Sequence, residues 1–108
     1  MKDLNSLMKQ AQVMQARMGA AQEKIAALEV VGTAGGGAVR LILKGSGELT
    51  KLDIDESLIA PGEGEMVADL VIAAHADAKR QLDEQSGSLM REAAGPLAGL
   101  NIPGMPKF

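Results

Sequence analysis

The chain opens on an apolar pattern that has the period of an α-helix. Between residues 3 and 29, apolar side chains recur at spacings of three and four, which places them on one helix face at about 100° per residue. They are Leu4, Leu7, Met8, Ala11, Met14, Met18, Ala21, Ile25 and Leu28. Such a helix is roughly 40 Å long, whereas a domain of this size is about 26 Å across. Part of the helix should therefore project beyond the domain. Its apolar stripe then needs a partner, and a second copy of the chain is the simplest one.

The next segment changes to the period of β-strands. On its second strand Val39, Leu41 and Leu43 share one side, and the polar residues Arg40 and Lys44 alternate with them. Glycine-rich turns separate the strands, which is typical of an antiparallel meander. Three strands leave two open edges, a second reason to expect dimerisation or cover by a helix. The expected strands are residues 29–33, 38–44 and 48–55, and the expected turns are residues 34–37 and 45–47.

A second helix and an irregular tail complete the predicted order. Asp55 is a suitable cap for a helical turn over residues 55–59. The next helix is predicted over residues 63–94, with one apolar face formed by Val67, Leu70, Val71, Ala74, Ala78, Leu82 and Leu89. Three glycines and three prolines then follow within fourteen residues. We expect a single α+β domain over residues 1–94 and a flexible tail over residues 95–108.

Composition narrows the possible functions. Of the 108 residues 46% are apolar, but Phe108 is the only aromatic residue, which excludes aromatic stacking platforms for single-stranded nucleic acid. The chain has no cysteine, which excludes disulfides, thiolate zinc sites and thiol catalysis. Its one histidine, His75, has no evident base or nucleophile as a partner. We therefore expect no enzyme, no metal, no cofactor and no small-molecule substrate. Without a signal peptide or a membrane span in the sequence, a soluble cytoplasmic protein is expected.

Charge becomes informative only through its position. The 11 basic and 14 acidic residues give a net charge of −3, which by itself argues against nucleic-acid binding. On the first helix, however, the basic residues are 7, 8 and 7 positions apart and occupy an arc of about 80° opposite the apolar face. They are Lys2, Lys9, Arg17 and Lys24. This stripe is suited to contacting successive phosphates. The competing interpretation is an ordinary solvated helix face.

Other candidates favour a structural interpretation. On the second helix Lys79, Arg80 and Arg91 form a weaker basic group, because acidic residues lie near them on the helical wheel. Gly35 to Gly37 lie between strands and lack the Gly-Lys-Ser/Thr of a phosphate loop, so a hairpin turn is predicted. The spacing of Asp53, Asp55 and Glu56 matches no calcium loop. Met8, Met14 and Met18 form a stripe that suits the core, a homodimer interface or an adaptable partner site.

Several segments, taken in order, resemble the YbaB/EbfC nucleoid-associated proteins. They are Leu7-Met8-Lys9-Gln10-Ala11-Gln12, Met14-Gln15 and Met18 in the first helix; Leu28-Glu29-Val30, Gly32 and Gly35-Gly36-Gly37 at the first strand and hairpin; Leu52-Asp53-Ile54-Asp55 and Ser57-Leu58 around the third strand; and Leu70-Val71, Ala73-Ala74 and Asp77-Ala78 in the second helix. The resemblance covers almost the whole chain. It implies a tweezers-like α+β homodimer whose helical arms project from a joined sheet core. It also implies double-stranded DNA binding in the bacterial cytoplasm, with a role in nucleoid organisation and gene regulation.

The expected function is therefore that of a homodimeric, nucleoid-associated DNA-binding protein that contacts mainly phosphates. The basic stripe supplies the candidate contacts, with Lys9, Arg17 and Lys24 first and Lys79, Arg80 and Arg91 second. The alternative is an acidic dimeric adaptor or chaperone that holds a partner polypeptide against the methionine-lined face.

Overall fold

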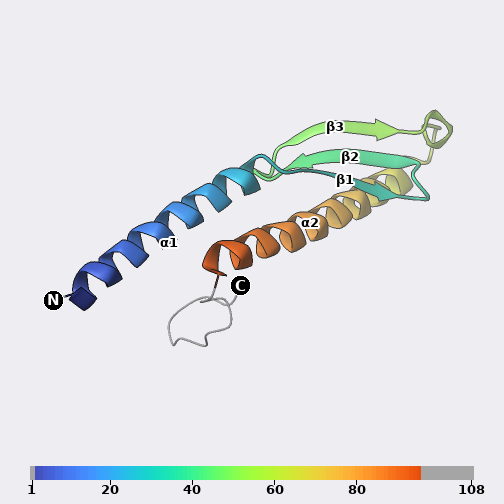
Figure 1. The fold of residues 1–108 in the computed structure, drawn as a ribbon. Coiled ribbons are helices and arrows are strands. Elements are labelled where there is room, and N and C mark those ends of the chain that lie inside the picture. Colours follow the sequence, from blue (N-terminus) through green and yellow to red (C-terminus); the bar gives the residue numbers. More distant parts are fainter. Residues whose placement is uncertain (1, 96–108) are drawn as a thin grey trace.

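The computed structural model describes residues 2–95 and consists of two long helices and a three-stranded sheet (Figure 1). Along the chain the elements are α1 (Lys2–Ala26), β1 (Glu29–Ala34), β2 (Val39–Lys44), β3 (Leu49–Ile54), the 3-10 helix η1 (Glu56–Leu58) and α2 (Gly64–Ala94). This confirms the α+β class and the predicted order, although α1 ends three residues before the predicted boundary. The predicted flexible tail lies, apart from Gly95, outside the described residues.

The sheet is an antiparallel meander in the order β1-β2-β3, and α2 lies along one of its faces (Figure 1). The predicted alternation on β2 is confirmed, since Val39, Leu41 and Leu43 are at most 1% exposed and Arg40 is exposed. These three side chains form the core together with Val30, Ala74, Ala78 and Leu82. An apolar face that would otherwise meet water is thus covered by α2.

A close approach of α2 to β1 explains one glycine. A methyl group on Gly32 would overlap the Ala74 carbonyl oxygen and lie 2.7 Å from the Ala78 Cβ. Only a residue without a side chain therefore lets the helix backbone settle on this strand. Small residues, Ala74 and Ala78, face this strand from α2 for the same reason, because a larger side chain at either position would push the helix away from the sheet.

The hairpins and the short turn have the predicted chemistry. Gly35, Gly36 and Gly37 all have positive φ angles, of 64°, 69° and 94°, in the turn between β1 and β2. Asp55 caps η1 by accepting a 2.9 Å hydrogen bond from the Ser57 backbone N–H. That bond favours the ionised carboxylate and lowers the pKa of Asp55.

The helix α1 projects as predicted. The molecule measures 75 × 24 × 18 Å, and α1 extends with the C-terminal part of α2 beyond the sheet (Figure 1). Near its C-terminus α1 packs on α2, where Ala21, Ala93 and Ala94 are buried. The N-terminal half of α1 leaves its large apolar residues between 51% and 61% exposed; they are Leu4, Leu7, Met8 and Val13. Within residues 2–95, neither long helix carries an apolar stretch of the length that crossing a bilayer requires.

Candidate nucleic-acid interface

Three basic residues of α1 are exposed and have no carboxylate partner among the described residues. Within residues 2–95, Lys9, Arg17 and Lys24 all lie at the surface, and none of them belongs to a salt bridge. Lys9 lies on the N-terminal half of the helix, which is exposed on all sides. Its charge is therefore available to an anion that approaches this arm.

Arg17 and Lys24 lie closer to the second helix than expected. Both line a hollow between α1 and α2, together with Leu89, Glu92 and Ala93. Arg17 precedes the buried Ala21 by four residues, which is about 40° around the helix axis. These two residues therefore border the packed stripe instead of lying opposite it. Met14, Met18 and Ile25 of the predicted apolar face are half-buried beside Ala21, and Arg17 and Lys24 line the hollow at its edge.

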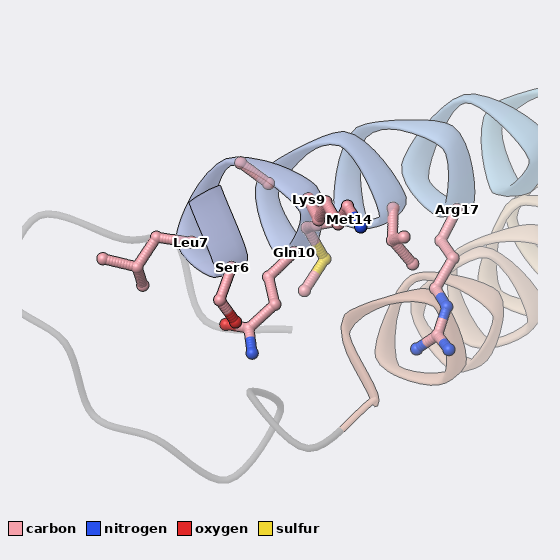
Figure 2. A pocket seen from close by; sticks show the side chains of 8 residues that line it. Ser6, Leu7, Lys9, Gln10, Met14 and Arg17 are labelled. Atoms are coloured by element: carbon pink, nitrogen blue, oxygen red, sulfur yellow. The ribbon is translucent and has the colours of Figure 1, made fainter. Parts of the chain in front are cut away.

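Figure 2 shows the side chains along the outer part of α1. Ser6, Gln10 and Arg17 point to the side on which α2 ends, and Leu7 points away along the free end of the helix. The guanidinium of Arg17 reaches the end of α2, where a methyl group on Gly95 would lie 3.1 Å from its Nη1. Arg17 therefore also has a structural role that the sequence pattern did not indicate.

The second basic group is neutralised in large part by its own helix. Lys79 pairs with Asp83, and Arg80 donates to Asp77 at 2.9 Å and to Glu84 at 3.1 Å. Both carboxylates raise the pKa of Arg80 by stabilising its charged form. The prediction that acidic residues lie near this group is confirmed for both residues. Arg91 in the last turn of α2 is exposed and forms no salt bridge within residues 2–95.

The sheet carries charges of both signs on the face away from α2. Arg40 is opposite Asp53 in the strand register, and Lys51 lies 3.7 Å from Asp53. Because each cation has a carboxylate nearby, this face offers no continuous basic surface. Arg40 therefore serves to keep this sheet face soluble rather than to extend a phosphate-binding surface.

Sequence reasoning missed a polar cluster at the outer edge of β1. The Asp77 carboxylate accepts a 3.1 Å hydrogen bond from the Thr33 backbone N–H, and the Gln81 amide donates to the Val31 carbonyl oxygen at 2.9 Å. The bond from Thr33, followed by that from Arg80, lowers the pKa of Asp77. The four-residue spacing of Asp77 and Gln81 on α2 was the only signal in the sequence. Within the described part of the chain, no group of three His, Cys, Asp or Glu side chains is placed to hold a metal ion.

Comparison with known proteins agrees with this long-armed α+β fold. The model of the YbaB/EbfC DNA-binding family matches residues 1–97, and the chain belongs to this family. A nucleoid-associated protein of Phenylobacterium zucineum is 68% identical over 108 residues, which cover 100% of this chain and 99% of the relative. A nucleoid-associated protein of Caulobacter sp. (strain K31) is 60% identical over 107 residues, which cover 97% of this chain and 98% of the relative.

A solved structure has the same fold. The crystal structure of an uncharacterized protein from Helicobacter pylori matches with a TM-score of 0.58 and 28% sequence identity, over 70% of this chain and 88% of the other. The family predicted from the segments of the sequence is thereby confirmed, and so is the α+β class of the fold.

Proposed function

We propose that this protein binds double-stranded DNA as a homodimer, mainly through phosphate contacts, and takes part in organising the bacterial nucleoid and in gene regulation. The observation that carries the proposal is the pair of exposed lysines on α1, Lys9 on its projecting half and Lys24 beside α2, which lack carboxylate partners within residues 2–95 in a chain of net negative charge. Membership of a DNA-binding family and relatives named nucleoid-associated proteins support it.

We rank the candidate contacts by the ion pairs that compete for them. Lys9 and Lys24 come first, since no ion pair with another described residue competes with a phosphate for them. Arg17 can share its charge between DNA and the end of α2. Lys79 and Arg80 come second, because a phosphate would have to replace the carboxylates of Asp83, Asp77 and Glu84. Arg91, on the same helix, forms no ion pair with another described residue and does not have this competition. With few free cations per copy, a dimer doubles the contacts and raises the affinity through avidity.

Titration of a fluorescent duplex at several salt concentrations tests the proposal. The variant Lys9→Gln/Lys24→Gln removes two charges per copy from α1, and Lys79→Gln/Arg80→Gln removes two from α2 as a matched control. Each lost phosphate contact lowers the slope of log K against log[salt] by about 0.9. We expect the α1 variant to flatten the slope and the α2 variant to change it much less.

The outcomes separate the components of the proposal. Similar losses on two unrelated duplexes support phosphate contacts, which carry no direct sequence information. If the α2 variant loses more than the α1 variant, the interface lies on α2. If the parent protein binds no duplex even at low salt, the proposed DNA binding is wrong.

One observation favours the adaptor function as a second candidate. Leu4, Leu7, Met8 and Val13 leave an apolar surface on the arm that α2 does not cover. A protein that binds no duplex, but binds an apolar polypeptide less tightly when Leu7 and Met8 are both changed to Ser, would have this function instead.

A further inference from the structure

The outer half of α1 extends beyond the end of α2. Helix α2 ends at Ala94, and Gly95 lies beside Arg17 in the middle of α1. Toward its N-terminus, α1 continues past this point (Figure 1). Residues 3–13 are exposed, so no element within residues 2–95 packs on this half of the helix. An apolar partner for it must come from outside that range.

A groove follows this half of the helix from Ser6 to Arg17 (Figure 2). This α1 groove has a volume of about 630 Å³, within the range of pockets that bury a drug-sized molecule. Two of the side chains that line it, Leu7 and Val13, are 61% and 51% exposed. Their burial against an apolar segment would therefore be favourable.

The chain leaves α2 at the inner end of the α1 groove. Gly95 has φ 56° and ψ −128°, a conformation that glycine adopts more readily than other residues, and it turns the backbone out of the helix. Pro96 follows, and a proline cannot continue the hydrogen bonding of a helix. Because α1 and α2 run in opposite directions (Figure 1), the segment after Gly95 starts beside the half of α1 that α2 does not reach.

The segment after Gly95 has the length and the composition to fill the α1 groove. From Ser6 to Arg17 the groove runs roughly 16 Å along the helix. About five extended residues span that distance, so residues 96–102 reach its far end. This stretch has no charged residue, and its large apolar side chains are Leu97, Leu100 and Ile102.

The charges beside the α1 groove favour this segment over the arm of a second copy. Lys9 and Arg17 line the groove, and neither has a carboxylate partner within residues 2–95. A second α1 in this place would bring its own Lys9 and Arg17 against them, and like charges repel. Residues 96–102 can lie beside both cations without repelling or neutralising them.

We propose that residues 96–102 dock in the α1 groove of the same copy. Leu97 and Leu100 anchor the segment, and Leu7 and Val13 supply the surface that they bury. Pro96 restricts the undocked backbone, which lowers the entropy that docking costs. The docked segment supports the projecting half of α1, since most of the stability of a helix in a protein comes from tertiary packing. The flexibility expected of the tail then belongs to the residues after 102.

A spin label in the full chain tests the docking. The chain has no cysteine, so Asn101→Cys accepts a single nitroxide label between Leu100 and Ile102. In NMR spectra this label should broaden the amide signals of residues 7–14 beyond detection. The matched label at Glu63→Cys is exposed at the start of α2, about 45 Å away along that helix, and should leave these signals sharp.

Two pairs of substitutions test whether the α1 groove is the docking surface. Leu7→Ser/Val13→Ser changes two apolar residues that line it, and Leu4→Ser/Met8→Ser changes two similarly exposed residues of the same helix half outside it. With the label at residue 101, the groove pair should restore the signals of the unchanged residues, whereas the control pair should leave them broadened. Circular dichroism of both variants checks that the chain is folded.

A mixture of chains identifies the copy on which the segment docks. When an isotope-labelled parent is mixed 1:1 with a spin-labelled chain that lacks the isotope, only contacts between copies broaden signals, and α1 should stay sharp. Broadening in this mixture would overturn docking on the same copy. Sharp signals in the doubly labelled chain itself, or broadening that survives Leu7→Ser/Val13→Ser, would overturn the α1 groove as the docking surface. The duplex titration reports separately on DNA binding.

Discussion

Arg17 on α1 reaches Gly95, the residue at which α2 ends. A methyl group on Gly95 would lie 3.1 Å from the Arg17 Nη1, and the Gly95 N–H bonds to the carbonyl oxygens of Arg91 and Glu92. The C-terminus of a helix carries partial negative charge, so a guanidinium at this position is favourable. Arg17 thus connects the middle of α1 to the C-terminal end of α2.

The contact predicts that charge reversal at Arg17 costs stability, whereas the same change at Lys9 does not. Arg17→Glu should lower the free energy of unfolding by about 1 kcal/mol, because it places a carboxylate at the negative end of α2. Lys9→Glu, on the exposed arm, should stay within about 0.5 kcal/mol of the parent. Urea unfolding followed by circular dichroism measures both. Equal stabilities would mean that Arg17 does not support the end of α2.

Two glycine substitutions should act in opposite directions. Gly32→Ala should destabilise the protein by at least about 1–3 kcal/mol, since its methyl group would overlap the Ala74 carbonyl oxygen. Gly19→Ala should stabilise it by about 0.5–1 kcal/mol, because Gly19 is within α1 and nothing lies within 4 Å of the added methyl group. Thermal unfolding of both variants tests the close approach of α2. A Gly32→Ala protein as stable as the parent would contradict the packing described here.

Asp77 should contribute to the loss of stability in acid. Hydrogen bonds from Thr33 and Arg80 lower its pKa in the folded state. The folded protein therefore binds this proton less readily than the unfolded chain does, so the contribution is complete above the unfolded pKa of about 3.9. It is lost as the pH falls from about 5 through the lowered pKa. The melting temperature of Asp77→Asn should thus depend less steeply on pH in this range.

Asp69→Asn is the matched control for this prediction. Asp69 is an exposed carboxylate on the same helix and makes no hydrogen bond to a described side chain or backbone group. The melting temperature of Asp69→Asn, plotted against pH, should run parallel to that of the parent. If the Asp77→Asn profile is also parallel, the bond to Thr33 does not stabilise the folded state.

The elements could be predicted from the sequence because periodicity is a local property. The alternation at Val39, Leu41 and Leu43 places the core side of β2, and the glycines at 35–37 place the first hairpin, without knowledge of the rest of the chain. The family could also be predicted from the sequence, because the segments that resemble it occur in the same order along this chain. No long-range contact is needed for either conclusion.

The candidate interface was less predictable because it depends on how the helices pair. The bond between Asp77 and Thr33 joins residues 44 positions apart, so no local pattern reveals that one sheet edge is closed. The wheel of α1 gave the relative positions of Arg17 and Lys24, but not the direction from which α2 approaches them. Propensity and periodicity describe one element at a time, whereas the availability of a charge depends on its neighbours in space.

The side chains of Asp77 and Gln81 on the edge of β1 also limit stoichiometry. A sheet with two available edges can add copies head to tail without end, and such growth produces fibres. Here the Val31 carbonyl and the Thr33 N–H already have partners on α2, so the β1 edge is a poor template for a further strand. Growth of the sheet through this edge would first have to break both bonds. Two hydrogen bonds from a helix to a strand thus oppose open-ended growth of the sheet on this side.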